Sequence, residues 1–405
     1  MHVWKGAYPM LEYLALPAIA LTAALIPKKK LKDKEKIRRI LENTNVSINK
    51  GDTKQHPKLI REYNNEFYTT YIYSLPFGLH SDTFIDQIPA ISEGINKEVE
   101  HEFSDGVLKL HVYHESLPNK WTFTDDLLRP GTWEIPIGKN HRGTFFHDFD
   151  KYQTFLIGGV PGFGKTVLTK IMFNALILNN PQDVNIYVLD LKGGLEYSKY
   201  LGLPQVKGVA SDVYEATEIL IEIVEKMKVM ESHFKQHGYT NIVDTDIKQR
   251  TFLFIDEGAE LSPSMVSKDK QQYAKACQTM ISEVARIGRA IGFRLIYSTQ
   301  YPSSRSIDMS IKMNILAKVS FVVSNHVASQ VILDESGAEQ LPSIPGRCIY
   351  LIDKPRIIQV PYIDDKTIFN MMEDRKDEIN RTNRTIIDDN RHITPSDNKT
   401  SSWHT

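Results

Sequence analysis

The sequence predicts an α/β protein whose main domain is doubly wound around a mostly parallel sheet. Expected strands and helices alternate from residue 150 onward, and several of the strands are unbroken runs of Val, Ile, Leu and Phe. A glycine-rich turn joins the first of these strands to the first helix. Unbroken apolar runs are typical of parallel strands that are buried on both faces. The alternation of the two element types places helices on both sides of such a sheet.

The main domain is expected to occupy residues 131–365. Its helices are expected near residues 165–178, 212–237 and 271–291, and the second repeats apolar side chains every three or four positions, as a helix packed on a sheet does. The segment 133–139 leads into this domain. The expected strands are Gln153–Gly158, Val184–Asp190, Thr251–Asp256, Phe293–Thr299, Ala317–Val323 and Arg347–Ile352.

Other segments surround the main domain. Residues 65–130 are predicted to form a small α+β domain, residues 40–64 a linker plus a helix, and the polar residues 366–405 a disordered tail. The elements expected in the small domain are a strand at Phe67–Leu75, a helix at Thr83–Ile95, and the strands Lys97–Phe103 and Val107–Tyr113 on either side of Ser104-Asp105-Gly106.

Residues 1–39 carry the pattern of a membrane anchor. The apolar stretch 7–26 has twenty residues, which as a helix would span about 30 Å, the thickness of a bilayer core. Glu12 interrupts this stretch, so a buried or docking helix is the alternative. The block 28–39, with eight basic and two acidic residues, follows directly and would keep that side in the cytoplasm. We therefore expect a single-pass protein of the cell membrane, with its main domain in the cytoplasm.

Composition excludes several classes of protein. Hydrophobic residues make up 41% and charged residues 24% of the chain, which allows a sizeable core and excludes a disordered or fibrous protein. Only two cysteines, Cys277 and Cys348, are present, too few for a disulfide framework or a cysteine-based zinc cluster. The 49 basic residues nearly balance the 50 acidic ones, so nucleic acid would have to be bound through local surfaces.

The glycine-rich turn is a phosphate-binding motif of the form G-x4-G-K-T. It consists of Gly159, Val160, Pro161, Gly162, Phe163, Gly164, Lys165 and Thr166. Glycines allow backbone N–H groups to curl around a phosphate, and the following helix adds the positive end of its dipole. Lys165 is expected to reach the β- and γ-phosphates, and the Thr166 hydroxyl to bind Mg²⁺. The sequence therefore predicts a nucleotide site, with ATP preferred because no guanine-specific Asn-Lys-x-Asp segment is present.

A second motif is expected at the same edge of the sheet. The apolar strand Thr251–Asp256 is followed by Glu257, and the carboxyl ends of parallel strands face the crevice where nucleotides bind. Asp256 is expected to hold Mg²⁺, and Glu257 to polarise the attacking water, which favours ATP hydrolysis over phosphorylation of a small molecule. Gln300 ends the next strand and is a candidate sensor of the γ-phosphate.

Several stretches between about residues 130 and 362 resemble the FtsK/SpoIIIE family of DNA translocases. Arg286–Pro302 is similar to that family's Gly-Arg-Ala-x-Gly-x-x-Leu and Ala-Thr-Gln-Arg-Pro segments, and Ile311–Ile315 and Val331–Leu341 resemble two further blocks. Asp190–Gly194 looks like the variant found in Gram-positive conjugative elements. Tyr301 departs from the family pattern, as do Gln330 and Val331.

The resemblance implies a RecA-like motor that assembles as a homohexameric ring on DNA, with ATP bound between subunits. An arginine from the neighbouring subunit would then act at each site, and Arg289 and Arg286 are the candidates, with Arg305 a weaker one. The short architecture is similar to that of membrane-anchored coupling proteins in conjugation, whose partners would include a relaxase and transfer-channel proteins.

Two other functions stay open at this point. Within the same class, the motor could serve chromosome or plasmid segregation or phage DNA packaging. In a different class, the chain could be an ATP-dependent scaffold or switch that moves nothing, which the departures at Tyr301 and Gln330 would allow. DNA-stimulated ATP turnover separates a translocase from a switch.

Overall fold

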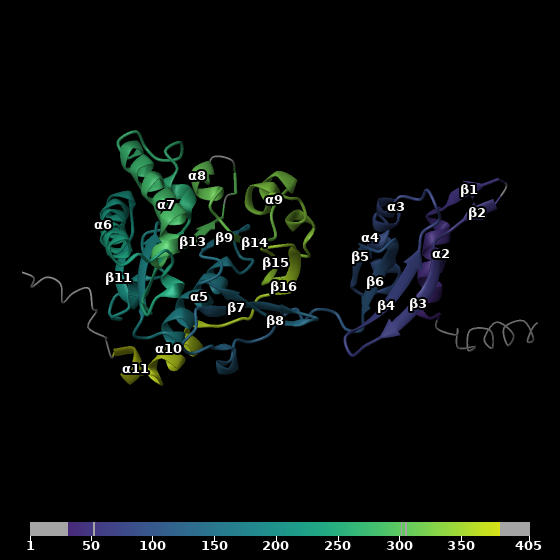
Figure 1. Cartoon of the computed structure of the whole chain (residues 1–405), viewed down its shortest axis with the longest axis horizontal. Helices are drawn as coiled ribbons and strands as arrows, with labels where there is room; N and C mark the ends of the chain where they lie inside the picture. Colours follow the sequence, from purple (N-terminus) through teal and green to yellow (C-terminus); the bar gives the residue numbers. More distant parts are fainter. Residues whose placement is uncertain (1–30, 52, 301, 304–305, 381–405) are drawn as a thin grey trace, which may run out of the picture. The chain divides into compact units, whose positions relative to one another are not determined.

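The structure is a computed structural model, and it describes residues 31–51, 53–300, 302–303 and 306–380. The chain divides into two compact units at the boundary between Ser116 and Leu117 (Figure 1). We describe each unit by itself.

The first unit contains a four-stranded antiparallel sheet in the order β3-β4-β6-β5. Its strands are β3 (Lys58–Asn64), β4 (Tyr68–Ser74), β5 (Val99–Ser104) and β6 (Val107–Tyr113), and its helices are α2 (Asp33–Asn43), α3 (Ser81–Ile85) and α4 (Ile88–Ile95). A separate hairpin joins β1 (Ile48–Lys50) to β2 (Thr53–Gln55). The core of this unit packs the buried side chains of α2 and α4 against β4 and β6.

Two details of the first unit differ from expectation. Residues 40–64 are not a linker plus a helix, because they hold the end of α2, the β1–β2 hairpin and β3. All seven residues of β3 are exposed, so this edge strand lacks the alternation that reveals a half-buried strand. The expected helix Thr83–Ile95 is two helices. Pro89 lies in the first turn of α4, where a residue without an N–H group is tolerated, so a new helix begins there.

The second unit is built on a ten-stranded sheet in the order β11-β10-β12-β13-β9-β14-β15-β16-β7-β8. Neighbours from β11 to β14 pair in parallel, and those from β14 to β8 are antiparallel. The parallel strands are β9 (Thr154–Gly158), β10 (Val184–Asp190), β11 (Val206–Ala210), β12 (Arg250–Asp256), β13 (Phe293–Thr299) and β14 (Ala317–Phe321). The others are β7 (Glu134–Asn140), β8 (Gly143–Asp148), β15 (Arg347–Leu351) and β16 (Pro355–Gln359).

Helices cover both faces of this sheet, as the predicted doubly wound fold requires. Helix α5 (Lys165–Asn179) packs with β7 in one buried cluster, whereas α6 (Val213–His237), α7 (Gln271–Ile291) and α9 (His326–Leu333) pack in the other. A short helix, α8 (Met309–Lys312), follows β13. The predicted α/β class with a large, mostly parallel sheet is confirmed.

The end of the described chain corrects another expectation. Residues 366–405 were predicted to be a disordered tail, but α10 (Asp365–Glu373) and α11 (Lys376–Asn380) occupy the first part of it. Ile368, Met371 and Met372 are buried in the same cluster as α5, and this burial stabilises a segment whose overall composition is polar. Residues 381–405 lie outside the described residues.

The predicted single-pass location in the cell membrane is not supported. Across residues 31–380, apart from the few positions left undescribed, no helix is both long and apolar enough to cross a bilayer. The segment 7–26 on which the expectation rested lies outside the described residues, as does the start of the basic block 28–39.

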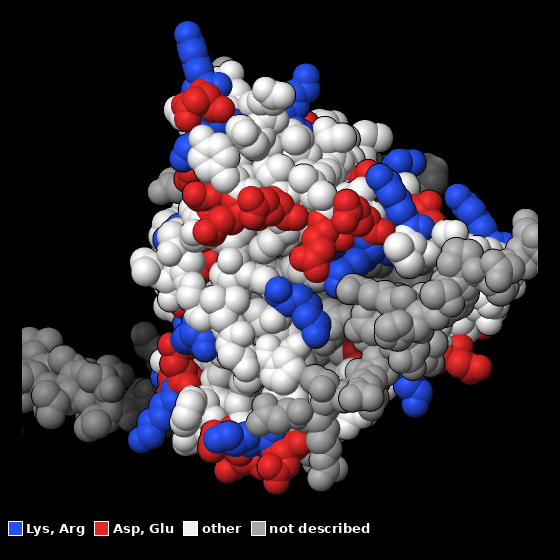
Figure 2. All heavy atoms as spheres, turned by 90° about the vertical axis from the view of Figure 1, so that its left-hand side faces the viewer, with Lys and Arg blue, Asp and Glu red and all other residues white. Residues whose placement is uncertain are grey.

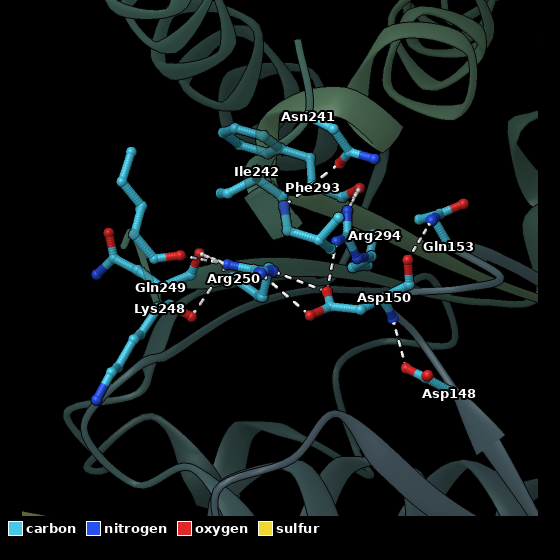
Figure 3. Close-up of polar contacts among 12 residues, drawn as sticks. Asp148, Asp150, Gln153, Asn241, Ile242, Lys248, Gln249, Arg250, Phe293 and Arg294 are labelled. Atoms are coloured by element: carbon cyan, nitrogen blue, oxygen red, sulfur yellow. Dashed lines mark hydrogen bonds and ion pairs between the residues drawn. The ribbon is translucent and has the colours of Figure 1, made fainter. Parts of the chain in front are cut away.

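A buried ion-pair cluster ties together the starts of the parallel strands (Figure 3). The Asp150 carboxylate accepts hydrogen bonds from Arg250 at 2.8 and 3.0 Å and from Arg294 at 2.7 Å. The Arg294 side chain is wholly buried. Burial alone would raise the pKa of Asp150, but the hydrogen bonds and charges of the two arginines outweigh it and hold that pKa below its usual range. This cluster lies at the N-terminal ends of the parallel strands, whereas the candidate site lies at their C-terminal ends.

Candidate active site

The phosphate-binding loop connects β9 to α5 in a conformation that only glycine adopts easily. Gly159, Gly162 and Gly164 have positive φ angles of 143°, 86° and 114°. A Cβ on Gly159 would lie 2.7 Å from the Cβ of Phe321, so the loop could not lie so close to β14 with a larger residue. Two backbone hydrogen bonds of 2.9 Å, from Val160 N–H to Val322 and from Gly346 N–H to Phe163, fix the loop.

Lys165 begins α5 and turns its side chain back over the loop. Its Nζ donates to the carbonyl oxygens of Gly159 at 2.6 Å and Val160 at 2.8 Å. Burial lowers the pKa of Lys165 to about 8, although the charges of Glu257 and Asp256 oppose this shift. The ammonium group therefore lies inside the loop, where phosphate oxygens can replace the two carbonyls as acceptors.

Asp256 ends β12, and Glu257 follows it directly. The Glu257 side chain is 1% exposed, and its carboxylate accepts hydrogen bonds from the Thr299 hydroxyl at 2.9 Å and from the Gln300 N–H at 2.9 and 3.1 Å. Burial raises the pKa of Asp256, while Lys192 opposes this shift. Glu257 is thus a buried carboxylate that the end of β13 holds in one orientation.

The backbone at Glu257 is strained. Its φ and ψ are both 61°, a left-handed conformation that costs a residue other than glycine about 1–3 kcal/mol. The next residue is Gly258, where a Cβ would overlap the ring of Tyr297. Strain of this kind persists where the surroundings hold it and is concentrated at active sites, which fits the hydrogen bonds that Glu257 accepts.

A cavity of about 540 Å³ opens beside the loop, a volume typical of a small-molecule site. Lys165, Thr166 and Gln300 line it together with residues distant in sequence. The remaining lining residues are Asn119, Lys120, Pro161, Gly162, Gly164, Val167, Pro345, Gly346, Gln359, Val360, Pro361 and Tyr362. The Lys120 ammonium lies 4.4 Å from the centre of the Tyr362 ring. The structure thus brings the predicted loop and Gln300 to one pocket.

The candidate arginines lie elsewhere. Arg286 and Arg289 are exposed near the C-terminal end of α7. Helix α7 leads directly into β13, so its C-terminal end lies at the start of that strand, whereas Gln300 follows the strand's end. Within one subunit the structure therefore does not bring these arginines to the pocket. Arg305 lies outside the described residues.

Two further residues lie beside Asp256, although the sequence indicated them only as part of the family-like stretch Asp190–Gly194 and with no role. Asp190 ends β10 beside Asp256, with which it pairs in register, and Lys192 follows it in the next loop. The signal for Asp190 was present, because a carboxylate that ends a buried parallel strand is the same pattern that identified Asp256. The far wall of the pocket, formed by residues 119–120, 345–346 and 359–362, gave no local signal.

Comparison with known proteins supports the predicted family for part of the chain. Residues 128–253 match the FtsK/SpoIIIE family. This match covers the loop, α5 and the first part of β12, and it ends before Asp256, Glu257 and Gln300. The chain carries an FtsK/SpoIIIE-family P-loop ATPase domain. The predicted family and the predicted class of enzyme are confirmed.

Curated relatives of the FtsK/SpoIIIE domain are named DNA translocase FtsK. The protein of Tropheryma whipplei is 27% identical over 253 residues, which are 59% of this chain and 34% of the relative. The protein of Caldanaerobacter subterraneus subsp. tengcongensis is 32% identical over 249 residues, which are 58% of this chain and 33% of the relative. The match thus spans about a third of the length of these relatives.

Solved structures share the fold at low sequence identity. The pCW3 conjugation coupling protein TcpA, solved as a monomer with ATPγS, matches with a TM-score of 0.61 and 20% identity over 85% of this chain and all of that one. The cytoplasmic domain of the type VII secretion ATPase EccC of Thermomonospora curvata matches with a TM-score of 0.54 and 19% identity, over 64% of this chain and 33% of that one. This chain therefore shares its fold with a conjugation coupling protein and with a type VII secretion ATPase.

Proposed function

We propose that this protein is an ATP-driven DNA translocase that acts as a coupling protein in conjugative DNA transfer. The observation that carries the proposal is the likeness in fold to TcpA, which extends over all of that chain and 85% of this one. The FtsK relatives, by contrast, align over about a third of their length. Their names favour a translocase of DNA, and the TcpA likeness favours conjugation over segregation.

The residues of the phosphate-binding loop and of the neighbouring end of β12 support ATP hydrolysis. Lys165 and the N–H groups of the loop would bind the phosphates. The Thr166 hydroxyl and the Asp256 carboxylate are the oxygen donors that Mg²⁺ prefers, and the bound ion would neutralise charge on the phosphates. Glu257 would accept a proton from the attacking water, and the hydrogen bonds from Thr299 and Gln300 would orient its carboxylate for this role.

Assembly and partners belong to the same proposal. A homohexamer would place Arg286 or Arg289 of one subunit at the pocket of the next, and both side chains are exposed, as a trans-acting arginine must be. A relaxase and transfer-channel proteins are the partners that a conjugative role implies.

One face of the second unit is unsuited to DNA. Figure 2 shows a row of acidic side chains across the side that carries α6. Exposed glutamates recur along this helix every three or four residues, at Glu215, Glu218, Glu222 and Glu225. Phosphate groups would be repelled there. DNA would therefore have to contact the protein on another face.

DNA should accelerate ATP turnover by the purified protein with Mg²⁺, because a translocase couples hydrolysis to its track. Phosphate release is measured with single-stranded DNA, with double-stranded DNA and without DNA. The matched control is the Lys165→Ala variant, which should hydrolyse ATP under none of these conditions. Turnover that is slow and indifferent to both kinds of DNA would contradict the proposal and favour a nucleotide-dependent switch.

A test in cells separates conjugation from segregation. Donor cells that carry Lys165→Ala in place of the wild-type residue should lose transfer of the element that encodes this protein, while their chromosomes segregate normally. Normal transfer together with defective segregation would instead favour the alternative role of a segregation motor.

A further inference from the structure

Lys192 lies in a tightly built turn directly after β10. The turn begins at Asp190, whose wholly buried carboxylate accepts hydrogen bonds from the N–H groups of Glu196 at 2.9 Å and Tyr197 at 3.2 Å. Gly193 and Gly194 continue it with positive φ angles of 86° and 72°. Asp190 thus fixes the loop that carries Lys192, because its hydrogen bonds close the turn across six and seven residues.

This loop places the Lys192 ammonium group against the two catalytic carboxylates. Its Nζ lies 3.6 Å from Asp256 Oδ2 and 3.5 Å from Glu257 Oε2. The carboxylate side chains are 12% and 1% exposed, and that of Lys192 is 37% exposed. The Lys192 side chain is therefore more exposed to solvent than the two carboxylates, and its positive charge partly neutralises theirs.

A third carboxylate increases the local negative charge. Asp190 pairs in register with Asp256 on the neighbouring strand, and its Oδ1 atom has no hydrogen-bond partner among the described residues. Lys165, the other cation of the site, donates to the loop carbonyls of Gly159 and Val160. In the described part of the chain, Lys192 is accordingly the cation that pairs with both Asp256 and Glu257.

We propose that Lys192 is a catalytic residue that contacts the γ-phosphate of ATP bound in its own subunit, an inference that rests on the proposed ATP hydrolysis. Asp256 would hold Mg²⁺ when nucleotide is bound, and two cations so close to one carboxylate would repel each other, which favours movement of the ammonium group away from Asp256. The displaced ammonium group would then be free to turn toward the phosphates of the incoming triphosphate. Because the Lys192 side chain is long and partly exposed, its ammonium group can turn from Asp256 toward the phosphate without any change in the backbone of β10.

The chemistry leaves Lys192 protonated throughout. Water adds to the γ-phosphorus as the bond to the bridging oxygen of ADP breaks, the proton of that water passes to Glu257, and phosphate and ADP leave. Lys192 contributes only positive charge, beside the oxygens of the transferred group. Removing one such preorganised donor typically lowers kcat by about 10²–10³.

The test compares the Lys192→Met variant with wild type in turnover and in binding. We expect kcat for ATP to fall at least about 100-fold. We also expect the variant to lose affinity for the non-hydrolysable triphosphate AMP-PNP while its affinity for ADP stays within about twofold. The binding ratio is measured by equilibrium titration with Mg²⁺, and a residue that only supports the fold would not change it. Lys192→Arg should recover part of the loss, because it keeps the charge with a different shape.

Lys199→Met is the matched control. Lys199 lies seven residues along the same segment, is 43% exposed and pairs with Asp365 at 2.9 Å, so its loss should change neither measurement. Turnover by Lys192→Met within about threefold of wild type, or an unchanged ratio of the two affinities, would overturn the proposal. If wild type itself hydrolyses no ATP, the proposed function fails, whereas loss of turnover in Lys165→Ala but not in Lys192→Met sinks only this inference.

Discussion

Glutamine in place of Glu257 should nearly abolish ATP turnover while ATP still binds. The substitution removes the carboxylate that we propose as the base for the attacking water, and general-base catalysis is typically worth about 10²–10⁴ in rate. The amide has nearly the shape of the carboxylate, so the Thr299 hydroxyl and the Gln300 N–H can still donate to its oxygen. Phosphate release measures turnover, and titration with a fluorescent ATP analogue measures binding.

Glu260→Gln provides the comparison for this variant. Glu260 lies three residues further along, in the short 3₁₀ helix Gly258–Leu261, and its side chain is exposed. Its substitution should leave turnover unchanged. Turnover by Glu257→Gln close to that of wild type would show that another group activates the water.

Alanine in place of Asp150 should lower the free energy of unfolding by about 3–5 kcal/mol. This change would leave Arg250 and Arg294 without their shared carboxylate, and the Arg294 side chain is fully buried. An unpaired buried charge costs far more than the ion pair contributes. Urea-induced unfolding followed by tryptophan fluorescence measures the loss, since the buried Trp133 ring lies 5.9 Å from the Arg250 guanidinium carbon.

An exposed pair of the same chemistry gives the control. Arg356 donates to both oxygens of Asp353, whose side chain is 62% exposed, so Asp353→Ala should cost at most about 1 kcal/mol. The pH dependence adds a second check. Because the folded pKa of Asp150 is lowered, its contribution is complete above the unfolded pKa of about 4 and is lost as pH falls through the folded value. Equal losses in the two variants would contradict the account.

Strands buried on both faces could be predicted from the sequence, and edge strands could not. Val184–Asp190 and Phe293–Thr299 were predicted with their observed bounds, because an unbroken apolar run marks a central parallel strand. The short β11 at Val206–Ala210 has two glycine or alanine residues among five and gives no such signal. The antiparallel extension through β16, β7 and β8 depends on contacts between segments more than 200 residues apart, which local patterns do not encode.

The candidate site divides in the same way. Lys165, Thr166, Asp256 and Glu257 could be predicted because each follows from its place at a strand end or helix start. Lys192 could not be recognised, because a lysine in a polar turn resembles any solvated charge until the neighbouring strand ends are placed beside it. Arg286 and Arg289, at the end of α7, are candidate trans-acting arginines through the family resemblance alone, and their role depends on a second subunit.

The central claim is that ATP hydrolysis at this site moves the protein along DNA. The most direct measurement is displacement of streptavidin from the end of biotinylated DNA, single-stranded and double-stranded, by the purified protein with ATP and Mg²⁺. Wild type should displace streptavidin from at least one of the two DNAs, and Glu257→Gln should displace it from neither. Streptavidin that stays bound to both while ATP is hydrolysed would contradict the claim.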